Sequence, residues 1–128
     1  MKLLIFGSRD AANKDCQLEI ELAVVNLKAT EILTAAEPSG ACEVARDYAK
    51  ANGIPLTLFF KQRQRNAGMY HHRSVQAIDA CDYAIFLWNG DSKGTANEIK
   101  ICQKAGKPYE VISVSKDDDG WNLTEWDG

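Results

Sequence analysis

Strand-like apolar runs alternate with segments of helical periodicity along almost the whole chain, and this alternation restricts the fold more than any other feature. Short apolar runs bounded by turn residues indicate buried strands, whereas apolar residues at three- and four-residue spacing indicate amphipathic helices. Strands are expected at residues 3–6, 31–35, 56–60, 83–88 and 108–114, and helices at 15–28, 41–51, 69–80 and 95–104. This order predicts an α/β fold, Rossmann-like, with a mainly parallel five-stranded sheet and helices on both faces.

The composition fits one domain over residues 1–115, followed by an acidic tail over residues 116–128. The chain has 128 residues, of which 45% are hydrophobic, enough for a core that folds without disulfides or metal. Its formal net charge is −3. The tail has one lysine against five acidic residues, a net charge of −4, so the rest of the chain has a net charge of +1. A nearly neutral body argues against a broad basic face for nucleic acid.

Neither a metal centre nor a redox pair nor a membrane anchor is indicated. The cysteines lack short paired spacing, and no acidic or cysteine residue accompanies His71 and His72 at metal-ligand spacing. The apolar run after Lys2 is too short for a signal peptide or a membrane span. We therefore expect a cytoplasmic protein with reduced thiols, no metal, no cofactor and no membrane partner. The four cysteines are Cys16, Cys42, Cys81 and Cys102.

The strongest functional signal lies in residues 82–98. An apolar strand pattern ends in the turn Asn-Gly-Asp-Ser-Lys-Gly-Thr, and a helical pattern follows directly. Amides at a helix start lack acceptors within the helix and attract an anion, and glycines let a ligand approach the backbone. The sequence therefore predicts phosphate binding here, although Ser92 or Thr95 could instead only cap the helix. The residues expected to bind the ligand are Gly90, Ser92, Lys93, Gly94 and Thr95.

Two further turns follow strands and would open at the same edge of the sheet. The first is Gly7-Ser8-Arg9, whose arginine could form a bidentate contact with a phosphate or carboxylate. The second contains Ser39 and Gly40 ahead of a helix. Each turn also has an ordinary explanation. Arg9 could be a surface arginine after a tight turn, and the second turn could be an ordinary connection that caps the following helix. Glu37 in the second turn would repel an anion unless it faces a sugar hydroxyl.

Arg73 and Glu98 are candidates for chemistry, and each has an ordinary explanation as well. Arg73 lies on the helix expected before the fourth strand, where an arginine is usually a solvated side chain. Glu98 lies one turn into the helix after Gly94, where any acidic residue gains from the positive end of the helix. Cys42 lies near a helix start without a neighbouring base in the sequence, and we expect it to be inert.

In these motifs the chain resembles the SLOG superfamily of Rossmann-like proteins, especially its small YspA-type branch, over residues 1–113. The matching pieces are residues 6–9, residues 39–41, Arg73 ahead of residues 81–82, and residues 86–95, of which the last is the specific one. The resemblance implies a nucleotide or a nucleotide-derived ligand such as an ADP-ribose derivative, and a homodimer.

The same superfamily includes the Lonely guy type phosphoribohydrolases, which release the base from a nucleoside 5′-monophosphate. They use an arginine and the glutamate of a Gly-Thr-x-x-Glu motif, and by this resemblance Arg73 and Glu98 would be catalytic. The second turn departs from the family pattern, because Ala-Glu-Pro at residues 36–38 replaces small residues. We therefore expect ligand binding, by a sensor or a sequestering protein. The alternatives are a nucleotide N-glycosidase and an interaction protein with a vestigial pocket.

Overall fold

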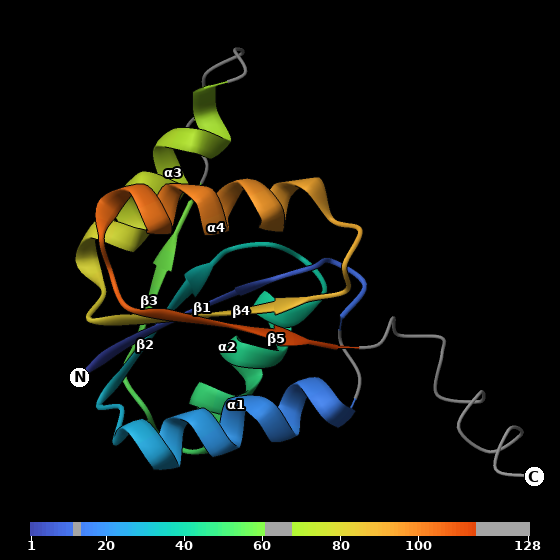
Figure 1. The fold of residues 1–128 in the computed structure, drawn as a ribbon. Coiled ribbons are helices and arrows are strands. Elements are labelled where there is room, and N and C mark those ends of the chain that lie inside the picture. Colours follow the sequence, from blue (N-terminus) through green and yellow to red (C-terminus); the bar gives the residue numbers. More distant parts are fainter. Residues whose placement is uncertain (12–13, 61–67, 115–128) are drawn as a thin grey trace, which may run out of the picture.

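The structure is a computed structural model that describes residues 1–11, 14–60 and 68–114. The acidic tail of residues 116–128 lies outside the described residues. Within these ranges strands and helices alternate as the sequence predicts (Figure 1). The elements are β1 Lys2–Gly7, α1 Lys14–Leu27, β2 Glu31–Ala35, α2 Ala41–Ala51, β3 Leu56–Phe59, α3 Gly68–Ala80, β4 Tyr83–Trp88, α4 Lys93–Ala105 and β5 Tyr109–Ser113.

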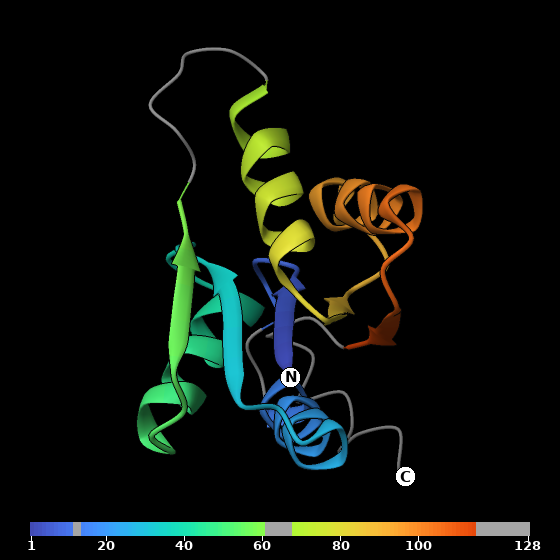
Figure 2. The same ribbon diagram turned by 90° about the vertical axis from the view of Figure 1, so that its left-hand side faces the viewer.

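The five strands form one parallel sheet in the order β3-β2-β1-β4-β5. Helices α1 and α2 cover one face of this sheet, and α3 and α4 cover the other (Figures 1 and 2). The predicted Rossmann-like α/β fold is therefore confirmed. Parallel strands need crossover connections, and the helices between them cover both faces of the sheet.

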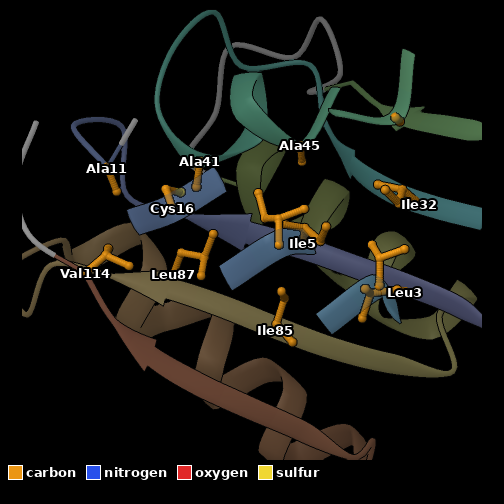
Figure 3. Close-up of a cluster of buried hydrophobic side chains, with 13 residues drawn as sticks. Leu3, Ile5, Ala11, Cys16, Ile32, Ala41, Ala45, Ile85, Leu87 and Val114 are labelled. Atoms are coloured by element: carbon orange, nitrogen blue, oxygen red, sulfur yellow. The ribbon is translucent and has the colours of Figure 1, made fainter. Parts of the chain in front are cut away.

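Each central strand contributes to two separate cores because successive side chains point to opposite faces of the sheet. Leu3 and Ile5 of β1 pack on the α1 and α2 side with Ile85 and Leu87 of β4 (Figure 3). Phe6, the neighbour of Ile5, packs on the α3 and α4 side. This explains why β1 and β4 appear in the sequence as unbroken apolar runs.

The bounds of α2 are as expected, those of the other helices differ from the expected ones by one or two residues, and local backbone chemistry explains the clearest difference. Helix α4 begins at Lys93, two residues before the expected start at Thr95, because the Ser92 hydroxyl accepts a hydrogen bond from the Thr95 amide. The helix ends at Ala105, and the capping residue Gly106 adopts the left-handed conformation with φ 73° and donates its amide to the last turn.

The strand order places a ligand crevice at the carboxyl ends of β1 and β4. The chain passes from β1 to β2 on one side, and β4 then returns on the other side of β1. Ligands of open α/β sheets bind at such a switch point. Gly7 pairs with Leu87 in the register, so the turns that follow β1 and β4 lie side by side.

No helix of the described ranges combines the length and the apolar character that a bilayer span requires.

Candidate functional site

A cavity of about 720 Å³ opens at the switch point between β1 and β4. Its walls come from the turns after β1, β2 and β4, from the starts of α2 and α4 and from the middle of α3, so elements distant in sequence meet there. The lining residues are Gly7, Arg9, Asp10, Glu37, Cys42, Arg73, Ser74, Asn89, Asp91, Ser92, Gly94, Thr95, Asn97 and Glu98. This volume suits a small-molecule ligand.

Two glycines allow the turns around the cavity to pack closely. A Cβ atom on Gly7 would lie 2.5 Å from the Ala41 Cβ and 2.5 Å from the Leu87 carbonyl oxygen. Gly40 has φ +82°, and a Cβ atom there would overlap the Ser8 carbonyl oxygen. Side chains at either position would push the turns apart. Gly7 lines the cavity, whereas Gly40 acts through packing.

Asn89 ties the turn after β4 to the turn after β1. Its Oδ1 accepts hydrogen bonds from the amides of Asp91 at 2.8 Å and Ser92 at 2.9 Å. Its Nδ2 donates to Asp10 Oδ1 at 2.6 Å, and its backbone amide donates to Ser8 Oγ at 3.1 Å. Asn89 was not among the predicted site residues, although an asparagine in a small-residue turn often bonds the backbone two residues on.

The start of α4 contributes Ser92, Gly94 and Thr95 to the lining of the cavity. Within the first turn, the Thr95 amide is taken by Ser92 Oγ at 3.3 Å. The amides of Lys93 and Gly94 precede it and have no acceptor within the helix. A Cβ atom on Gly94 would meet only Ser92 Oγ, at 4.0 Å, so packing does not require glycine there. The lack of a side chain at Gly94 keeps this backbone open toward the cavity.

A buried charge cluster forms the inner wall of the cavity. Arg73 Nη1 lies 2.8 Å from Glu37 Oε1, and Arg73 Nη2 lies 3.5 Å from Glu98 Oε2. Ser74 Oγ donates to Glu98 Oε2 at 3.3 Å. The guanidinium carbon of Arg73 lies 5.8 Å from the centre of the Phe6 ring, a cation–π contact. The predicted pair Arg73 and Glu98 is therefore brought together, and Arg73 is only 5% exposed rather than solvated.

Burial shifts the protonation of this cluster. It raises the pKa of Glu98 from 4.5 to about 7, because the charged carboxylate loses water, and the nearby Glu37 adds to the rise. The Arg73 guanidinium and the Ser74 hydroxyl oppose the shift. Burial also raises the pKa of the Cys42 thiol. Glu98 thus changes its charge near neutral pH, whereas Cys42 stays a neutral thiol, as the inert interpretation predicts.

Comparisons with known proteins leave the family open and support the fold. No family model matches the chain, and no curated protein matches it. A solved structure, that of the Moco carrier protein from Chlamydomonas reinhardtii, matches with a TM-score of 0.59 at 14% sequence identity. The match covers 98% of this chain and 83% of that chain. The two proteins share the Rossmann-like fold.

The cavity gathers most, but not all, of the residues predicted to contact a ligand. Ser8 is buried and holds the turns together through its hydroxyl and carbonyl oxygens. Gly90 adopts φ +90°, a Cβ atom there would have no neighbour within 4 Å, and the residue does not line the cavity. Contacts of Ser8 and Gly90 with a ligand therefore stay predictions, as do the ligand contacts of the other predicted residues. Among the predicted residues, the lining includes Gly7, Arg9, Arg73, Ser92, Gly94, Thr95 and Glu98 but not Ser8, Ser39, Gly40, Gly90 and Lys93.

Within the described ranges, no group of three or more histidine, cysteine or acidic residues has the geometry to hold a metal ion.

Proposed function

We propose that this protein binds a small phosphorylated ligand, derived from a nucleotide, and acts as a sensor or sequestering protein. The single observation that carries the proposal is the cavity at the β1–β4 switch point, onto which the open backbone of Gly94 at the start of α4 faces. A helix start offers amide donors and a positive dipole end to a phosphate group.

Two further observations support this proposal. Arg9 lines the cavity, and its side chain is 66% exposed, so a ligand can reach its guanidinium although Glu37 Oε2 lies 3.7 Å away. The matched solved structure is of a protein named as a carrier of Moco, which is consistent with a small-molecule binding role for this fold. The SLOG-type membership, the nucleotide identity of the ligand and the homodimer remain parts of the proposal.

Isothermal titration calorimetry with AMP, ADP-ribose and cyclic ADP-ribose tests the proposal. We expect at least one of them to bind, and Gly94→Asp to weaken that binding by tenfold or more because it adds negative charge at the anion site. An aspartate in a first helical turn favours the helix, so the variant should stay folded. Asn26→Asp on α1 adds the same charge on the opposite face of the sheet and should leave binding unchanged. No binding across the panel would overturn the proposal.

One observation favours catalysis as a second candidate function. Glu98 is buried beside Arg73 and Ser74, and its pKa of about 7 is suited to a general base near neutral pH. In an N-glycosidase reaction, water would bond to C1′ of the ribose as the bond to the base breaks. Glu98 would stabilise positive charge on the sugar and take a proton from the water, while the leaving base takes a proton from solvent and Glu98 afterwards returns its proton to solvent. Arg73 would orient the Glu98 carboxylate.

Chromatographic detection of free adenine from AMP tests this second function. Glu98→Gln should slow release by about two to three orders of magnitude, as removal of a charge-stabilising group typically does. Glu110→Gln on the exposed edge strand is the matched control and should not change the rate. Absence of adenine with the wild-type protein would rule out this reaction and would leave the binding proposal standing.

A further inference from the structure

Glu37 lies between the two arginines of the cavity. Its Oε1 is 2.8 Å from Arg73 Nη1, and its Oε2 is 3.7 Å from Arg9 Nη2. The side chain of Glu37 is 13% exposed and that of Arg73 is 6% exposed, so these two groups meet largely away from water. A charge-assisted contact in such surroundings is stronger than one at the surface.

The backbone around Glu37 is also held in place. Arg46 of α2 donates from Nη1 to the carbonyl oxygen of Ala35 at 3.1 Å and to that of Glu37 at 2.5 Å. The Ala36 amide donates to the Phe59 carbonyl oxygen at 3.1 Å. These hydrogen bonds fix the backbone of the turn after β2. They thereby hold the Glu37 carboxylate in place beside the guanidinium groups of Arg9 and Arg73.

The charges that line the cavity are not those of a polyphosphate site. Arg9 and Arg73 are the basic residues of the lining, and Glu37 contacts both of them. Arg73 is shared further with Glu98. The acidic residues of the lining outnumber the basic ones: they are Asp10, Glu37, Asp91 and Glu98.

A first phosphoryl group can use the amides at the start of α4, which need no side-chain cation. A second phosphoryl group would add more negative charge to a partly enclosed cleft, where the acidic side chains would repel it. It would therefore need the two arginines to compensate its charge. Glu37 already neutralises Arg73 and lies 3.7 Å from the exposed Arg9, so it would oppose the second group electrostatically.

We propose that Glu37 is a specificity-determining residue that limits the ligand to one phosphoryl group, through its simultaneous contacts with Arg9 and Arg73. This inference rests on the proposed binding function and selects among its ligands. It favours a nucleoside monophosphate over diphosphate compounds such as ADP or ADP-ribose.

Calorimetric titration of AMP and ADP into the wild-type protein and three variants tests the inference. The wild-type protein should bind AMP at least tenfold more tightly than ADP. Glu37→Gln removes the charge, so it should improve ADP affinity by tenfold or more and AMP affinity by less. Glu37→Asp keeps the charge and should keep the preference for AMP. Glu43→Gln makes the same change in the first turn of α2, outside the cavity lining, and should behave as wild type.

The outcomes separate this inference from the binding proposal. Equal or tighter binding of ADP by the wild-type protein would leave the binding proposal intact and overturn the role of Glu37. An unchanged ratio of AMP to ADP affinity in a folded Glu37→Gln protein, with circular dichroism as the check of folding, would overturn it as well. If the wild-type protein and Glu37→Gln bind neither nucleotide, the role of Glu37 is overturned, and the binding proposal fails too if ADP-ribose and cyclic ADP-ribose do not bind.

Discussion

At the scale of single residues, Glu98 shows how burial turns an ordinary helix residue into a titratable group. In sequence, a glutamate in the first turns of a helix is explained by the helix dipole alone. In the fold, its carboxylate lies beside Arg73 and Ser74 in the inner wall of the cavity, and its pKa rises to about 7. The folded protein therefore holds a proton on Glu98 at pH values where the unfolded chain has lost it.

This difference predicts how Glu98 affects stability as pH changes. Between about pH 4.5 and 7 the unfolded chain binds fewer protons at this position, so the contribution of Glu98 to stability falls as pH rises. The full shift corresponds to about 3 kcal/mol. The free energy of unfolding of Glu98→Gln, relative to wild type, should therefore increase by up to this amount from pH 4.5 to pH 8. Urea denaturation at several pH values measures it, and a pH-independent difference would contradict the prediction.

Arg73 illustrates the limit of sequence analysis at this scale. Its proximity to Glu98 could be anticipated from the family resemblance, but its contact with Glu37 could not. Glu37 is 36 residues away from Arg73 in the chain, and the pair forms only because the fold brings the turn after β2 next to the middle of α3. The sequence positions of Glu37 and Arg73 do not predict this contact, so only the fold shows that Glu37 neutralises Arg73.

At the scale of elements, the strands and helices were predictable because their patterns are local. The buried runs of β1 and β4 and the glycine-rich turn before α4 depend on residues that lie next to one another in sequence. The role of Asn89 was not predictable, because half of its partners belong to the turn after β1. Local chemistry thus identified where the turns lie, whereas the contacts that hold them together required the register of β1 against β4.

The two ends of α2 provide a prediction with an internal control. Gly40 before the helix and Gly53 after it both have positive φ, 82° and 65°. A Cβ atom at Gly40 would overlap the Ser8 carbonyl oxygen, whereas one at Gly53 would have no atom within 4 Å. Gly53→Ala should cost only the backbone strain, about 1 kcal/mol. Gly40→Ala should cost about 3 kcal/mol, because the turn after β1 must also move.

Chemical denaturation of the two alanine variants measures this difference directly. Equal losses of unfolding free energy would mean that the turns after β1 and β2 can separate without cost. In that case the close approach of Ser8 to Gly40 would not define the cavity wall, and its shape would have to depend on the sheet alone.

At the scale of the whole molecule, the described residues hold a complete sheet with a core on each face. Every strand has its parallel partner, and the last described residue, Val114, is buried in the α1 and α2 core and donates its amide to the Trp88 carbonyl oxygen at 3.0 Å. The proposed domain boundary near residue 115 therefore falls directly after a residue that the core requires. The acidic tail, with its net charge of −4, follows it in sequence.

We therefore predict that residues 1–115 fold and bind without the tail. A chain that ends at Ser115 should unfold in urea in one transition, with a midpoint close to that of the full chain and a similar dependence on denaturant, because it keeps all five described strands and the residues of both cores. A chain that ends at Ile112 removes the buried Val114 and its hydrogen bond, so it should be less stable by about 2 to 3 kcal/mol. A large loss of stability in the longer chain would instead show that the tail contributes to the core, and the proposed domain would have to extend to residue 128.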